Sequence, residues 1–111
     1  MFIKEEISDK EKDFQSLCKA HIIKYIYAFG SAFTTRFDKD HSDIDLLVDI
    51  DTPDPVKRGE TLVSLWDSFE LFFQRKVDLL TESSIHNSNL RRSIDSTKIL
   101  IYDGIRQKVL V

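Results

Sequence analysis

Three aspartates have the type and spacing to form one acidic cluster on a sheet. Asp43 and Asp45 alternate with apolar residues in the run SDIDLLVDI, so both side chains point to the same side of a predicted strand, about 6.6–7 Å apart along the backbone. Asp78 lies in a second short predicted strand, VDLL, whose flanking apolar residues must point inward. If the two strands are neighbours, all three carboxylates face the same side.

Three converging carboxylates repel one another, which drives them toward protonation. A hard dication removes this penalty. The cluster offers only oxygen ligands, with no His or Cys cluster nearby, and this suits Mg²⁺ or Mn²⁺ rather than zinc. Mg²⁺ held by a few carboxylates keeps open positions that substrate phosphates usually fill. Two such ions about 3.5–4 Å apart could stabilise the attacking and leaving oxygens of an in-line displacement.

A Gly-Ser pair stands at the end of the predicted strand that precedes the aspartates. The backbone N–H groups there and the Ser31 hydroxyl could cradle the β and γ phosphates of a nucleotide. Gly30 permits a close backbone approach that a Cβ would block. Arg36 and Lys39, in the following loop, could add positive charge opposite a triphosphate.

Changes of periodicity along the chain predict the elements that position these residues. We predict helices over about 9–21, 56–74 and 84–98, strands over about 22–29, 43–51, 77–80 and 99–102, and a loop over 32–42. Ser8 and Glu11 have capping-box spacing at the start of the first helix. The order indicates an α/β fold, a sheet of about four strands with helices covering one face and acids on the other. We expect the tail, residues 105–111, either to pair at an edge of the sheet, to fold back or to bind a partner.

Composition narrows the class of protein. With 111 residues the chain is expected to be one domain, 1–111, and its net charge of −3 argues against nucleic acid as a partner. It has no apolar run of about 18 residues and no signal sequence, so we expect no membrane span and a cytoplasmic location. Cys18 can form no internal disulfide and is expected to be a core thiol.

Other polar residues receive structural interpretations. Asp49 and Asp51 share the acidic face but lie farther from the Gly-Ser pair, so we expect them to be solvated. Arg91 and Arg92 could pair with acids or meet an acceptor, and a solvated helix face is favoured for both. His21 has no acid or cysteine at metal-ligand spacing and is interpreted as structural.

Taken together, the motifs resemble a known family. The order FGS, loop, SDIDLLV, long helix and VDLL is similar to that of the minimal nucleotidyltransferases of the DNA-polymerase-beta-type superfamily. The resemblance covers residues from about 22 to about 103. It includes the late segments LRRSI and KILIY, which are typical of the small bacterial members.

The resemblance implies roles for the residues that match the motifs. Asp43 and Asp45 would hold both metal ions, and Asp78 would help to hold the catalytic metal and act as base or orienter for an acceptor hydroxyl. Gly30 and Ser31 would contact phosphates. The full set of expected nucleotide-binding residues is Gly30, Ser31, Arg36 and Ser42.

The implied activity is transfer of a nucleotidyl group, AMP from ATP or another NTP, to an acceptor hydroxyl. The domain is too short for a large acceptor site, so a dimer mate or a separate protein is expected to bind the acceptor. Small bacterial members are often paired with a HEPN-type toxin, on which they adenylylate a tyrosine. An alternative is a non-catalytic antitoxin that keeps the fold, because residues 32–35 separate the Gly-Ser pair from Arg36. A P-loop kinase is a poor match, since no GxxxxGK[ST] is present.

Overall fold

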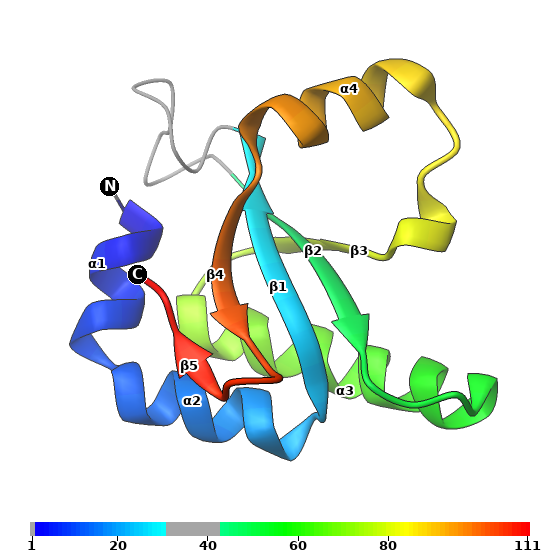
Figure 1. The fold of residues 1–111 in the computed structure, drawn as a ribbon. Coiled ribbons are helices and arrows are strands. Elements are labelled where there is room, and N and C mark those ends of the chain that lie inside the picture. Colours follow the sequence, from blue (N-terminus) through cyan, green and yellow to red (C-terminus); the bar gives the residue numbers. More distant parts are fainter. Residues whose placement is uncertain (1, 31–42) are drawn as a thin grey trace.

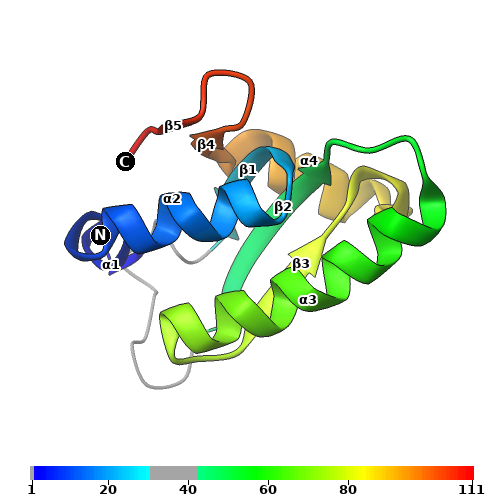
Figure 2. The same ribbon diagram turned by 90° about the horizontal axis from the view of Figure 1, so that it is seen from below.

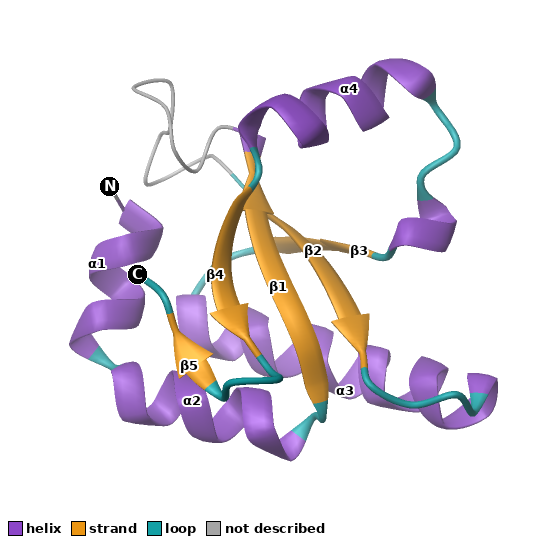
Figure 3. Ribbon diagram, viewed as in Figure 1, coloured by secondary structure: helices purple, strands orange, loops and turns teal. Residues whose placement is uncertain are grey.

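The computed structural model describes residues 2–30 and 43–111 as a mixed sheet with helices on both faces (Figures 1 and 3). The elements, in chain order, are α1 (Phe2–Asp9), α2 (Glu11–Ala20), β1 (Ile23–Phe29), β2 (Ile44–Ile50), α3 (Pro55–Phe73), β3 (Val77–Leu80), the 3₁₀ turn η2 (Glu82–Ser84), α4 (Ser88–Thr97), β4 (Ile99–Asp103) and β5 (Lys108–Val109).

The sheet has the strand order β3-β2-β1-β4-β5. β2 and β3 are parallel, and the 19-residue helix α3 forms the crossover between them. Every other neighbouring pair is antiparallel. Parallel neighbours need a long crossover, whereas antiparallel ones do not, so α3 is the element that brings the acidic strand β3 beside β2.

The main hydrophobic core lies between the sheet and α1, α2 and α3. Alternate residues of β2, from Ile44 to Ile50, face this core, as do Phe69 and Phe73 of α3. The ring of Phe14 in α2 stacks on Phe69 with the ring centroids 6.0 Å apart. Figure 2 shows α2 and α3 on this side of the sheet. Phe69 and Phe73 of α3 are therefore core residues, and Cys18 is a buried free thiol, as predicted.

The opposite face of the sheet is partly covered by α4. Ile94 is fully buried there and packs against Phe29 and Leu47 in a second, smaller cluster. Helices therefore lie on both faces, where the sequence predicted one. The reason is that Leu47 and Phe29 are apolar residues on the acidic face, and α4 covers them while the acids remain nearer the strand ends.

Most predicted elements are confirmed, with shifts at their ends. α1 is an additional helix, and Ser8 lies within it, so the expected capping box is wrong: α2 begins after Lys10, which makes no side-chain cap. The last predicted helix is divided into η2 and a shorter α4 that is capped by Asn87. The tail adds a fifth strand, β5, at the edge beside β4. Among the described residues, no helix is long and apolar enough to cross a membrane.

Candidate active site

Asp45 and Asp78 lie side by side on neighbouring strands. The parallel register of β2 and β3 pairs Asp45 with Asp78, so the two side chains leave the sheet on the same face. Both residues are half-buried. A hydrogen bond between the two carboxyl groups favours the protonated form of Asp45 and contributes to its raised pKa. The predicted meeting of these two acids on one face is confirmed.

The surroundings of Asp45 disfavour its negative charge. Burial is the largest cause that raises its pKa, to about 6, followed by the charges of Asp78 and Asp43 and by the hydrogen bond with Asp78. Asp43 is half-buried just before β2 begins and acts on Asp45 through its charge. A cation that replaced the shared proton would relieve both the repulsion and the burial penalty.

The carboxyl groups of Asp43, Asp45 and Asp78 do not converge on one point in this structure. Within residues 2–30 and 43–111, no three His, Cys, Asp or Glu side chains converge closely enough to hold a metal ion as they stand. The structure instead presents a formed pair, Asp45 and Asp78, with Asp43 as a third acid in electrostatic reach. The ligand triad expected from the sequence stays a prediction.

Helix α3 fixes the start of β3 and thereby the position of Asp78. Glu70 accepts a hydrogen bond from the Val77 N–H at 2.9 Å, and the indole N–H of Trp66 donates to the Val77 carbonyl at 2.6 Å. Two side chains of α3 thus hold both backbone polar groups of the residue before Asp78. The Ile44 N–H also donates to the Lys76 carbonyl at 3.1 Å, which ties the beginning of β2 to the same point.

Gly30 stands directly beside the carboxylate of Asp45. Phe29, the last residue of β1, pairs with Asp45 across the sheet, and Gly30 follows with a left-handed φ of 71°. A Cβ on Gly30 would lie 2.9 Å from Asp45 Oδ2, so any other residue here would adopt an unfavourable φ and would also displace that carboxylate. The Gly30 N–H donates to Thr97 Oγ1 at 3.2 Å. The sequence suggested a phosphate partner for such an N–H, and here a threonine accepts from it.

Thr97 is the residue at this site that sequence reasoning missed. It ends α4, 67 positions along the chain from Gly30, and no motif signals the contact. The other expected nucleotide-binding residues, Ser31, Arg36 and Ser42, lie outside the described residues, as does Lys39.

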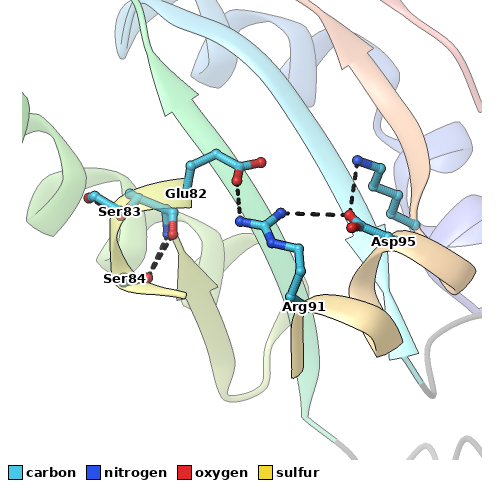
Figure 4. A network of polar contacts seen from close by, with 7 residues as sticks. Glu82, Ser83, Ser84, Arg91 and Asp95 are labelled. Carbon is cyan, nitrogen blue, oxygen red and sulfur yellow. Dashed lines mark hydrogen bonds and ion pairs between the residues drawn. The ribbon is translucent and has the colours of Figure 1, made fainter. Parts of the chain in front are cut away.

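A chain of alternating charges holds α4 to its surroundings (Figure 4). Arg91 pairs with Glu82 of η2 and with Asp95 one turn further along α4, and Lys98 also pairs with Asp95. The Lys98 ammonium lies 5.0 Å from the centre of the Tyr27 ring on β1. Of the roles considered for Arg91, pairing with acids is the one observed. His21 is structural, as predicted, since its ring bonds Leu17 O and Ser64 Oγ.

Comparison with known proteins identifies the family to which the chain is similar. Residues 12–107 match the family described as polymerase beta, nucleotidyltransferase. A relative from Methanocaldococcus jannaschii, named as a protein adenylyltransferase, is 32% identical over 99 residues, 89% of this chain and 94% of the relative. A minimal nucleotidyltransferase structure superposes with a TM-score of 0.58 at 24% identity, covering 86% of this chain and 92% of that one.

A chain of a mutant MntA–HpeT toxin–antitoxin crystal structure superposes with a TM-score of 0.54 at 26% identity, over 84% of this chain and 72% of that one. The family match spans both strands that carry the paired aspartates, the Gly30 turn and the helix that ends at Thr97. The chain therefore belongs to the polymerase beta nucleotidyltransferase family and is a nucleotidyltransferase.

Proposed function

We propose that this nucleotidyltransferase uses Mg²⁺, or Mn²⁺ in its place, to transfer AMP from ATP to a hydroxyl group of a partner protein. The observation that carries the proposal is the half-buried carboxyl pair of Asp45 and Asp78, which lies directly beside Gly30. In this reaction the acceptor oxygen bonds to the α-phosphorus of ATP. The bond between that phosphorus and the bridging oxygen breaks, and pyrophosphate leaves.

The carboxyl pair fits a hard dication. Its donors are all oxygens, and the burial and neighbouring carboxylates that raise the pKa of Asp45 are penalties that a bound dication would offset. Asp43, Asp45 and Asp78 would be the ligands. A bound dication would supply charge stabilisation for the phosphate oxygens during displacement.

Asp78 and Gly30 would each have a further role in the reaction. Asp78, held through Val77 by α3, would orient the acceptor hydroxyl and take its proton. The absence of a side chain at Gly30 leaves room above Asp45 for the phosphates to approach. The expected contributions of Ser31, Arg36 and Ser42 to nucleotide binding belong to this proposal as well.

A protein acceptor is supported by the names of the relatives. The M. jannaschii relative is named as a protein adenylyltransferase, and the MntA–HpeT structure is that of a toxin–antitoxin complex. We therefore propose that the acceptor is a tyrosine of a small helical, HEPN-type toxin, bound in a hetero-oligomer. A second copy of this chain in a homodimer is the other candidate to supply the acceptor surface.

The test is transfer of label from ATP to protein. The chain is incubated with Mg²⁺, native lysate and ATP labelled at the α-phosphate, and labelled proteins are resolved on a gel. We expect one labelled acceptor with the wild type and at least a roughly 100-fold loss with Asp45→Asn, since this substitution removes a ligand of the dication that would stabilise the transition-state charge. Asp49→Asn is the matched control, because Asp49 lies on the same face of β2 and farther from Gly30.

Two results would contradict the proposal. One is label that reaches the acceptor from ATP labelled at the γ-phosphate and not from ATP labelled at the α-phosphate, which would mean phosphoryl rather than nucleotidyl transfer. The other is transfer that Asp45→Asn leaves unchanged. A wild-type chain that transfers nothing and still inhibits its partner would instead support the non-catalytic antitoxin.

A further inference from the structure

We infer that Thr97 is a positioning residue for nucleotidyl transfer, because it holds Gly30 in place against the carboxyl group of Asp45. This inference rests on the proposed function. It concerns a residue of α4, a helix that lies outside the sheet carrying the paired aspartates and reaches Gly30 from a distant part of the chain.

The Thr97 hydroxyl makes two hydrogen bonds with defined directions. It donates to the Ser93 carbonyl at 2.8 Å, one helical turn back, and it accepts from the Gly30 N–H at 3.2 Å. Because its single proton is used on Ser93, a lone pair is left for Gly30. The two hydrogen bonds of this hydroxyl therefore connect the Gly30 N–H to the backbone of α4.

Gly30 needs such a support. The pairing of β1 with β2 ends at Phe29 and Asp45, and the pairing of β1 with β4 ends at Ala28 and Ile99, so Gly30 lies beyond both ladders. Glycine has the widest conformational freedom of any residue, and this one has a φ of 71°. A small movement of Gly30 would change the space directly above Asp45 Oδ2.

Helix α4 contacts the sheet and η2 at three positions. Arg91 is paired with Glu82 (Figure 4), Ile94 is fully buried against the sheet, and the Lys98 ammonium lies 5.0 Å from the centre of the Tyr27 ring. These contacts are spread along the helix, so its last residue, Thr97, has a fixed place relative to β1.

A purely local role for Thr97 is the competing explanation. Threonine commonly bonds the carbonyl four residues back in a helix, and this bond alone would require nothing of Gly30. Ser96 provides a matched control, because its hydroxyl donates to the same Ser93 carbonyl, at 3.1 Å. Among the described residues, the Gly30 N–H bonds the hydroxyl of Thr97 and not that of Ser96.

The experiment compares Thr97→Val, Thr97→Ser and Ser96→Ala in steady-state AMP transfer and in amide hydrogen exchange. We expect Thr97→Val to lower kcat about 10-fold with a smaller change in KM for ATP, since misplacement of reacting groups acts on the chemical step. Thr97→Ser should restore kcat to within about 2-fold of the wild type, and Ser96→Ala should leave it unchanged.

Amide exchange separates this inference from the proposed function. The Gly30 N–H should exchange about 10-fold faster in Thr97→Val, and as in the wild type in Thr97→Ser, even if the wild type transferred no nucleotide. The inference is overturned if Thr97→Val keeps the wild-type kcat or Gly30 exchange rate. It is also overturned if Ser96→Ala lowers kcat as much, or if serine at position 97 fails to restore it.

Discussion

Replacing Gly30 with alanine should damage activity more than stability. The added Cβ would lie 2.9 Å from Asp45 Oδ2, which is closer than real Cβ contacts. The left-handed φ of 71° costs an alanine about 1 kcal/mol relative to glycine. The contact itself can be relieved, because a carboxylate at the end of a side chain can rotate away. We therefore expect a loss of roughly 1–2 kcal/mol in the free energy of unfolding, or about 5–10 °C in Tm.

The loss of activity should come from the movement of the Asp45 carboxylate away from the added methyl group. If Asp45 rotates away from the new methyl group, its relation to Asp78 changes, and both acids belong to the proposed reaction centre. A displacement of about 1 Å at a reacting group can cost on the order of 100-fold in rate. We expect a loss of between about 10-fold and 100-fold in AMP transfer for Gly30→Ala.

Gly59→Ala is the matched control for this substitution. Gly59 is an exposed residue of α3, and a Cβ added there would meet none of the described atoms within 4 Å outside its own stretch of helix. Alanine should therefore stabilise the helix by about 0.5–1 kcal/mol and leave transfer unchanged. Thermal unfolding followed by circular dichroism, together with the labelled-ATP assay, measures both effects. A Gly30→Ala variant with wild-type Tm and activity would refute the proposed contact between Gly30 and Asp45.

Three further predictions concern the acids and α4. The folded-state pKa of Asp45, about 6, exceeds its ordinary value of 3.8, so the folded chain binds this proton more tightly than the unfolded chain does. The stabilisation by this protonation should be full below about pH 3.8 and should be lost as the pH rises through 6. Denaturation by urea at several pH values should show this slope in the wild type and not in Asp45→Asn. Mg²⁺ should raise Tm at pH 8 more than at pH 5, because it competes with the shared proton, and a Tm shift that Asp45→Asn retains would contradict the assignment. Ile94→Ala should cost about 2–4 kcal/mol by opening the small cluster beneath α4, whereas Leu90→Ala, on the outer side, should cost less than about 1 kcal/mol; equal costs would show that α4 is not anchored through Ile94.

The paired aspartates could be predicted because each strand carries its own directional signal. In β2 the side chain of Asp45 points to the face of the sheet opposite to that of the buried Ile44 and Leu46. In β3 the side chain of Asp78 likewise points away from the face that holds the buried Val77 and Leu79. The sequence did not determine which acid of β2 would stand beside Asp78. That register depends on how α3 packs and where it releases the chain into β3, which is set by tertiary contacts rather than by local pattern.

The elements that could not be predicted have weak local signals. α1 is short and acidic, and its buried side chains Ile3 and Ile7 give only one helical repeat. The contact between Thr97 and Gly30 joins residues 67 positions apart through one hydroxyl, a common side-chain group with no distinctive spacing. The position of α4 on the acidic face depends on Ile94 finding Leu47 and Phe29, a choice that the helical period of α4 alone does not make.

These contacts explain why the site lies where it does. Asp45 stands between two neighbouring backbone segments, and each is held by a different helix: α3 fixes Val77 on one side, and α4 fixes Gly30 on the other. The sheet alone would align the strands but would leave the segment beyond β1 without a partner for the Gly30 N–H. Since the charge of Asp45 is disfavoured by burial and by its neighbours, a loosely held surrounding would let the carboxylate escape to solvent. The two helices therefore keep the negative charge concentrated, which is the condition for a dication to bind there.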